Sequence, residues 1–230
     1  DGTELKDFKG NISLKDLYFQ YQDSRIPIFE GLTFEIEPGE LVAIKGSNGS
    51  GKSTLIKSII RLLDFNRGQI FYDSIEINQL SLNWLKKNLI YLPQEPSFID
   101  GTLLDNLLGL SEIKKDKMNS IIKNVDLDEF VNQSPEGIKM PIYNRGIDLP
   151  FGIRKRIALA RALVVDGQVV ILDEPTESID EKGRKSIYNL IKNFIKSKKT
   201  LIISTQDDEI LSNASCIIDL DTKPIPKIIT

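Results

Sequence analysis

The chain has 230 residues, of which 40% are hydrophobic and 27% are charged, values that are ordinary for a globular protein. Its formal net charge of −3 gives no general attraction to nucleic acid or to an anionic membrane surface. With no histidine and a single cysteine, Cys216, the sequence excludes histidine-based catalysis, histidine metal sites and an internal disulfide.

The first part of the chain alternates short apolar and polar runs. Residues 12–36 have this pattern, interrupted at Pro27 and Gly31, and predict a strand-rich lobe. A buried strand is expected over 41–45, followed by a glycine-rich loop and then a helix over 52–63. The next expected elements are strands near 69–77, a short helix over 82–88 and a buried strand over 89–92.

The composition changes between about residues 95 and 165, where strand-like runs disappear. Helical patterns cover 103–109, 115–124 and 152–164, which predicts an inserted helical lobe. Strand character returns in three later segments, with a helix expected between the first two. The strands are expected at 169–172, 201–203 and 217–218, and the helix at 181–195. Alternating strands and helices favour a largely parallel sheet with helices on both faces.

The expected organisation is therefore a single α/β domain over residues 1–230. It comprises a β-rich lobe, a core that contains the parallel sheet, and a helical lobe. The β-rich lobe covers about 1–40 and 66–78, the core 41–65, 79–94 and 166–230, and the helical lobe 95–165.

The loop between the strand at 41–45 and the following helix matches the phosphate-binding pattern G-x-x-x-x-G-K-[ST]. The candidate nucleotide-binding residues are Gly46, Ser47, Asn48, Gly49, Ser50, Gly51, Lys52, Ser53 and Thr54. Glycines allow the backbone to wrap around phosphates, and the helix that begins near Lys52 adds unpaired amides and its positive dipole end. Lys52 provides a charge for the outer phosphates, and the Ser53 hydroxyl can bind Mg²⁺.

Two acidic residues follow the apolar run 169–172. In a parallel sheet the ligand site lies at the carboxyl ends of the strands, so Asp173 is expected beside the phosphate loop as a Mg²⁺ ligand. Glu174 is then placed to orient and deprotonate the water that attacks ATP. Together these features predict a P-loop NTPase that binds ATP and Mg²⁺.

Over almost its whole length, and with its motifs in the same order, the chain resembles the nucleotide-binding domain of an ABC transporter. That domain is a P-loop fold with a RecA-like core. The resemblance implies that Tyr21 stacks on adenine, although a core tyrosine would give the same pattern. It also implies that Gln94, in Leu92-Pro93-Gln94-Glu95-Pro96, reaches Mg²⁺ and senses the membrane domain; this assignment depends on the family pattern alone. The segment 178–180 is similar to the loop that touches the opposite subunit.

Three segments resemble the exporter branch of the family. They are 98–107, the Tyr143-Asn144-Arg145-Gly146 run, in which asparagine replaces the usual glutamate, and 10–17, which is similar to the entry from a transmembrane domain. The chain begins with Asp1 rather than methionine, so we expect a piece of a fused exporter of the type I secretion or peptide kind. Expected partners are a transmembrane domain and a second nucleotide-binding domain, at the cytoplasmic face of a cell membrane. The expected cargo is a peptide or protein.

The sequence departs from the family at two sites. The signature, usually Leu-Ser-Gly-Gly-Gln, reads Leu149-Pro150-Phe151-Gly152-Ile153. In the family it covers the ATP of the partner subunit, and Pro150 provides neither a hydroxyl nor an amide donor, whereas Gly152 is retained. Gln206 occupies the place of the histidine that contacts the γ-phosphate; its amide can donate a hydrogen bond but cannot carry a positive charge.

These departures leave several alternatives open. A homodimer would turn over slowly, a heterodimer could supply an intact signature from its partner, or a subfamily could work with these residues. Besides an exporter ATPase, the sequence allows a regulatory subunit that binds ATP with little turnover. A soluble ABC protein acting on the ribosome or on DNA is disfavoured because there is no second cassette. A different P-loop class, such as a kinase, fits least.

Overall fold

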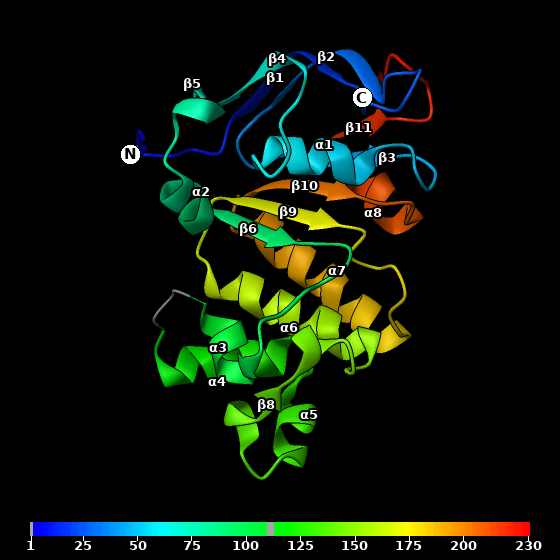
Figure 1. Cartoon of the computed structure of the whole chain (residues 1–230). Coiled ribbons are helices and arrows are strands. Elements are labelled where there is room, and N and C mark those ends of the chain that lie inside the picture. Colours follow the sequence, from blue (N-terminus) through cyan, green and yellow to red (C-terminus); the bar gives the residue numbers. More distant parts are fainter. Residues whose placement is uncertain (1, 110–112) are drawn as a thin grey trace.

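The computed structural model describes residues 2–109 and 113–230, and in these ranges the chain folds around a six-stranded sheet in the order β12-β11-β3-β10-β9-β6 (Figure 1). Neighbouring strands are parallel except β12, which is antiparallel to β11. The strands are β3 (Leu41–Lys45), β6 (Leu89–Leu92), β9 (Val169–Asp173), β10 (Thr200–Ser204), β11 (Cys216–Asp219) and β12 (Lys227–Ile229). Every residue of β9 and β10 is buried, as expected for central parallel strands covered on both faces.

Alternate residues of the central strands face two separate hydrophobic clusters. Val169 and Ile171 of β9 point to the side of α1 (Lys52–Ile59), whereas Val170 and Leu172 point to the opposite side. That opposite side is covered by α6 (Phe151–Val164) and α7 (Glu181–Lys196), which lie below the sheet in Figure 1. The remaining helices of the core are α2 (Leu82–Asn88) and α8 (Asp208–Asn213).

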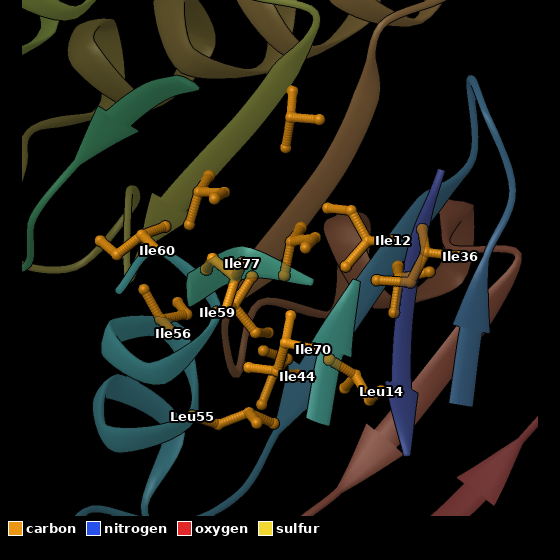
Figure 2. Packing of buried hydrophobic residues seen from close by; sticks show 14 of the residues in the cluster. Ile12, Leu14, Ile36, Ile44, Leu55, Ile56, Ile59, Ile60, Ile70 and Ile77 are labelled. Carbon is orange, nitrogen blue, oxygen red and sulfur yellow. The ribbon is translucent and has the colours of Figure 1, made fainter. Parts of the chain in front are cut away.

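A second, four-stranded antiparallel sheet is built from the described residues 12–76, in the order β2-β1-β4-β5. Its strands are β1 (Ile12–Phe19), β2 (Phe29–Ile36), β4 (Arg67–Tyr72) and β5 (Ile75–Glu76). Its apolar face packs against α1 and β3, where Ile12, Leu14 and Ile70 meet Ile44 and Leu55 (Figure 2). This contact fixes the position of α1, and with it the phosphate loop, relative to the β-rich lobe.

The helical lobe is inserted between β6 and β9. It contains α3 (Leu103–Leu108), α4 (Lys115–Asn124), α5 (Asp128–Gln133) and α6, with a short strand pair formed by β7 (Gly101–Thr102) and β8 (Pro141–Ile142). α3 begins with a capping box in which the Thr102 hydroxyl accepts from the Asp105 amide and the Asp105 carboxylate accepts from the Thr102 amide. Short 3₁₀ turns lie at Ile77–Gln79, Gly137–Lys139 and Asn144–Gly146.

Several elements differ from the expectations. The helix predicted over 52–63 ends at Ile59, because Arg61 adopts a left-handed backbone conformation (φ 58°) and stops the helix. The strand pair β7–β8 lies in the segment expected to be purely helical, and α5, α8 and β12 were not predicted. These elements are two to six residues long and bury few apolar side chains: α5 buries none, α8 buries Ile210 alone and all three residues of β12 are exposed, so they show no clear apolar repeat.

Among the residues that the structure describes, no helix combines the length and the apolar character needed to cross a membrane.

Candidate nucleotide-binding site

The phosphate loop connects β3 to α1, and it is packed so tightly that two of its glycines leave no room for a side chain. A Cβ atom at Gly46 would lie 2.3 Å from Ser50 Oγ, and one at Gly51, where φ is 111°, would lie 2.1 Å from Ile28 Cγ2. Among the described residues, no side chain caps the N-terminus of α1, so its first amides remain available to an anion. The buried Ser50 hydroxyl also lacks a hydrogen-bond partner within the described part of the chain. A cradle of this kind suits a phosphate group.

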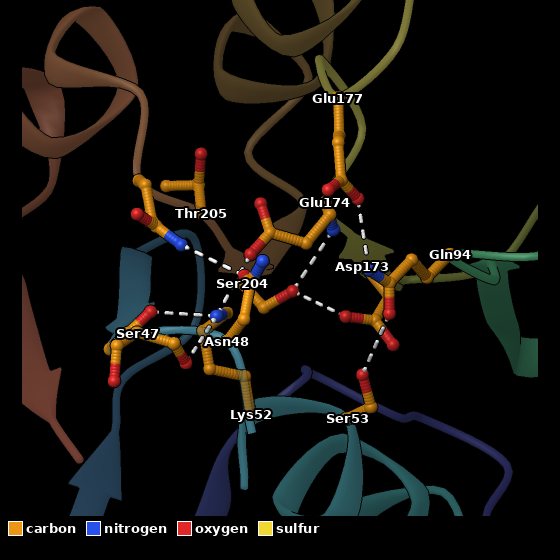
Figure 3. Close-up of polar contacts among 12 residues, drawn as sticks. Ser47, Asn48, Lys52, Ser53, Gln94, Asp173, Glu174, Glu177, Ser204 and Thr205 are labelled. Carbon is orange, nitrogen blue, oxygen red and sulfur yellow. Dashed lines mark hydrogen bonds and ion pairs between the residues drawn. The ribbon is translucent and has the colours of Figure 1, made fainter. Parts of the chain in front are cut away.

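The Lys52 ammonium lies at the centre of the site. It donates to the carbonyl oxygens of Gly46 (2.7 Å) and Ser47 (3.2 Å), and it forms a 3.0 Å ion pair with Glu174 Oε1 (Figure 3). Both side chains are more than nine-tenths buried, so each charge depends on the other in this arrangement. Lys52 follows β3 and Glu174 follows β9, the two strands that flank β10, and the structure brings their side chains into direct contact.

Asp173 ends β9 directly opposite Ser204, which ends β10. The Ser204 hydroxyl donates to Asp173 Oδ1, and Ser204 also accepts from the backbone N–H of Glu174. On the same side of the site, Ser53 Oγ lies 3.4 Å from Gln94 Oε1 (Figure 3). The Gln94 amide nitrogen donates to Glu177 Oε2 at 2.9 Å.

The oxygen atoms of Ser53, Gln94 and Asp173 are of the hard type that Mg²⁺ prefers. Among the described residues there is no cluster of three or more histidine, cysteine, aspartate or glutamate side chains that could hold a metal alone. A magnesium ion here would therefore be bound by few protein ligands and would complete its shell with phosphate oxygens and water. These residues fit a nucleotide-bound Mg²⁺ rather than a free one.

Tyr21 and Gln206 approach the loop from two further segments. The Tyr21 hydroxyl lies 2.8 Å from Thr54 Oγ1, its ring makes an edge contact with Phe19, and 47% of the residue is exposed. The residue is thus partly open to solvent, as a tyrosine that stacks on a base must be. The Gln206 amide donates to Asn48 Oδ1 at 3.2 Å, which places this residue against the phosphate loop.

The sequence profile described as ABC transporter matches residues 29–177, more than half of the chain. The chain belongs to the ABC transporter family. The match confirms the predicted P-loop fold and the prediction of an ATP-binding ATPase domain of this family.

Relatives of this ABC domain include "ABC transporter B family member 4" of Dictyostelium discoideum, 32% identical over 205 residues. The match covers 88% of this chain and 27% of that protein. An "ATP-dependent lipid A-core flippase" of Saccharophagus degradans is 33% identical over 214 residues, with coverages of 93% and 36%. The chain thus spans well under half the length of these relatives.

A solved structure described as a bacterial Atm1-family ABC exporter with ATP bound matches the fold with a TM-score of 0.85. It is 23% identical, and the match covers 99% of this chain and 41% of that chain. At this identity the likeness supports the fold of the ABC domain and not the roles of individual residues.

Gly152 lies in the first turn of α6, which begins directly after Pro150. A Cβ atom at Gly152 would meet no other heavy atom within 4 Å among the described residues. The structure therefore gives Gly152 no contact with the phosphate loop of its own chain. An open position is what a segment that covers a partner's nucleotide requires.

Four residues that the sequence analysis did not name as site residues also contact the site. Asp221, after β11, accepts from the backbone N–H (2.8 Å) and the hydroxyl (2.7 Å) of Ser47. Ser47 thereby holds the pKa of Asp221 below its ordinary value. Ser204, Glu177 and Lys155 contact Asp173, Gln94 and the backbone of Glu174. Of these four residues, only Ser204 could have been found from the sequence, because it directly follows the apolar run 201–203, just as Asp173 follows the run 169–172.

Proposed function

We propose that this ABC domain binds and hydrolyses Mg-ATP and thereby powers export of a substrate across a membrane, as part of a larger ABC transporter. The observation that carries the proposal is the direct pairing of Lys52 with Glu174 beside the Ser53, Gln94 and Asp173 oxygens. It joins the phosphate loop to the acid pair at the end of β9 in one site.

In the mechanism we propose, the loop amides and Lys52 bind the β- and γ-phosphates, while Ser53, Gln94 and Asp173 hold Mg²⁺. When bound, this ion neutralises charge on the phosphate oxygens. The γ-phosphate takes the place of Glu174 as the partner of Lys52, since both are anions that need the same buried ammonium. The Glu174 carboxylate is then released to bind a water molecule.

Glu174 accepts a proton from that water as its oxygen attacks the γ-phosphorus in line with the departing group. The bond between the γ-phosphorus and the bridging oxygen breaks, and ADP carries away the bonding electron pair. The products are ADP and inorganic phosphate. Lys52 and the loop amides stabilise the charge that develops on the phosphate oxygens.

The test is the Glu174→Gln variant of the purified chain. We expect ATP binding to persist and phosphate release to fall by at least about 100-fold, because glutamine can orient water but cannot accept its proton. Chelation of Mg²⁺ with EDTA should abolish turnover in the parent chain. Parental turnover in Glu174→Gln would show that Glu174 is not the base.

The partners in this proposal are a transmembrane domain and a second nucleotide-binding domain. The relatives support a larger assembly, because the chain spans only 27% and 36% of the two described above. An open cleft of about 630 Å³, lined by Asn48, Glu174, Gln206 and neighbouring residues, is available for a second domain to cover. Because the segments 98–107 and 143–146 resemble those of exporters, we further propose a peptide or protein cargo and a location at the cytoplasmic face of the membrane.

A second candidate function is a regulatory subunit that holds ATP with little turnover. It is favoured by Pro150, which has no amide hydrogen to donate from the signature, and by the neutral Gln206. The same phosphate-release assay separates the two functions. A chain that binds ATP but releases no phosphate, alone or joined to its membrane domain, would support the regulatory function.

A further inference from the structure

A buried lysine in the signature helix contacts the residue proposed as the general base. Lys155 lies in the second turn of α6 and is 3% exposed. Its ammonium donates to the backbone carbonyl oxygen of Glu174 and, at 3.0 Å, to that of Glu177. Burial lowers the pKa of Lys155 to about 8, against the opposing effect of the nearby acids Glu177, Glu174 and Asp173. Because moving a charged ammonium out of water costs free energy, a buried lysine needs hydrogen-bond acceptors that stabilise its charge.

The two carbonyl groups belong to opposite ends of one tight turn. The Glu177 amide donates to the Glu174 carbonyl oxygen at 3.2 Å, which closes the turn. Glu174 has a left-handed backbone conformation, with φ at 46°, which is unfavourable for a residue with a side chain. Lys155 contacts the turn at both ends and thereby stabilises this strained conformation.

The turn positions two functional side chains. The Glu174 carboxylate forms an ion pair with Lys52, and the Glu177 carboxylate accepts a hydrogen bond from the Gln94 amide. A rotation of the turn would move both carboxylates, and with them the general base and the neighbour of a proposed Mg²⁺ ligand. Reaction rates fall steeply when a reacting group is displaced by about 1 Å, because the alignment for attack is lost.

On its other side, Lys155 contacts the altered part of the signature. Its ammonium lies 5.6 Å from the centre of the Phe151 ring, and the Arg154 guanidinium lies 5.2 Å from the same ring. Phe151 and Lys155 are one turn apart on α6, so they share a helix face. The ring therefore provides a cation–π partner for the part of the ammonium that the two carbonyl groups leave open.

From these contacts we infer that Lys155 is a positioning residue for the ATPase reaction: it fixes the Glu174–Glu177 turn, and thus the base, to the signature helix. Phe151 takes part as the neighbour of that ammonium. The departure from the family signature at this position then has a local role within the chain. It supports the geometry of the chain's own base, in addition to any contact with a partner's nucleotide.

This inference rests on the proposed function, because it assumes that Glu174 is the base. The test compares Lys155→Met, which keeps a long unbranched side chain one atom shorter and removes every donor, with Lys155→Gln, which keeps an amide donor. Three quantities are measured for each purified variant: the turnover rate, the dissociation constant of ATP measured with EDTA present, and the melting temperature.

A positioning role predicts a loss in turnover without a loss in affinity. We expect Lys155→Met to lower kcat by about 10- to 100-fold, with ATP affinity within about twofold of the parent. Lys155→Gln should fall between the parent and Lys155→Met, and by at least about threefold. Since Lys155→Gln is the milder change, it decides the question if the methionine variant does not fold.

Two controls separate the possible failures. Glu174→Gln tests the base by itself, and in that background Lys155→Met should cause no further loss of turnover, because the base is already absent. Parental kcat in Lys155→Gln and Lys155→Met, with Glu174→Gln inactive, would overturn the positioning role alone. A parallel loss of ATP affinity, kcat and melting temperature would also overturn it in favour of a structural role. Full activity of Glu174→Gln would instead overturn the proposed function.

Discussion

Asp221 shows how a residue outside every motif can contribute to the phosphate loop. Its carboxylate accepts two hydrogen bonds from Ser47, the second residue of the loop. Because its folded pKa is lowered, this contribution is present above the ordinary pKa of about 3.9 and is lost only as the pH falls through the lower folded value. At neutral pH the contact is therefore fully formed.

We expect Asp221→Ala to weaken ATP binding by about 1 kcal/mol, or roughly fivefold, because the loop loses an ionised acceptor. Equilibrium titration with ATP at pH 7 would measure the change. Thr222→Ala is a matched control, since the Thr222 hydroxyl contacts only the turn carbonyls of Asp219 and Ile225 among the described residues. Equal affinities for the two variants would show that Asp221 does not support the loop.

The neutral side chain at Gln206 leads to a second prediction. Its amide contacts Asn48 on the loop, but it brings no positive charge to the γ-phosphate. Gln206→His should raise the turnover rate by roughly 10- to 100-fold, in line with a charge-assisted hydrogen bond of ~1.5–3 kcal/mol.

The gain in Gln206→His should be larger at pH 6 than at pH 8, because histidine is protonated below about pH 6.5. The turnover rate of Gln206→His is divided by that of Gln206→Asn at each pH. This ratio corrects for other groups that titrate, because they are the same in both variants. A ratio that does not change with pH would argue against a missing charge at this position.

Among the elements, the β3–loop–α1 segment is constrained by the β-rich lobe. Gly51 approaches Ile28, whereas a Cβ atom at Gly49 would meet no other heavy atom within 4 Å in the described structure. Both glycines have positive φ values, so alanine introduces backbone strain at either position. Only at Gly51 does a clash with a side chain of another segment add to the strain.

Gly51→Ala should therefore destabilise the nucleotide-free chain by about 1–3 kcal/mol more than Gly49→Ala, the usual cost of overpacking. In a domain of this size each kcal/mol lowers the melting temperature by about 2–4 °C. Thermal unfolding of both variants without nucleotide tests this difference. Identical melting temperatures would mean that Ile28 moves aside freely.

At the scale of the whole molecule, the candidate site lies at one edge of the sheet and opens into the cleft at Asn48, Glu174 and Gln206. This cleft is open to solvent among the described residues, whereas the proposed mechanism needs the attacking water to be sequestered. A second domain would provide this cover, with its own signature segment facing the nucleotide.

We expect Glu174→Gln to dimerise with Mg-ATP and to remain monomeric with Mg-ADP, because the variant binds ATP without consuming it. Light scattering coupled to size-exclusion chromatography would show a doubling of mass. Dimers of the chain alone would support a homodimer despite Pro150 and Phe151. Monomers under both conditions would contradict self-association and direct attention to a different partner domain.

What the sequence determined is local: the order of the main elements, the phosphate loop at 46–54 and the acids at 173–174. Apolar periodicity and a contiguous motif are properties of neighbouring residues, so they can be read without coordinates. The helices α5 and α8 and the strand pair β7–β8 were not predicted, because α5 buries no residue, α8 buries Ile210 alone and each strand has only two residues, so none shows an apolar repeat; α3 is as short as α5 but buries Leu103 and Leu107.

The tertiary structure decided which distant side chains meet. The Lys52–Glu174 ion pair joins residues 122 positions apart, and Asp221 reaches Ser47 across 174 positions. Such contacts depend on strand order and register, as when Ser204 lies opposite Asp173. Lys155 has the same origin: in the sequence it is one of three consecutive basic residues, and only the packing of α6 beneath the 174–177 turn buries it there.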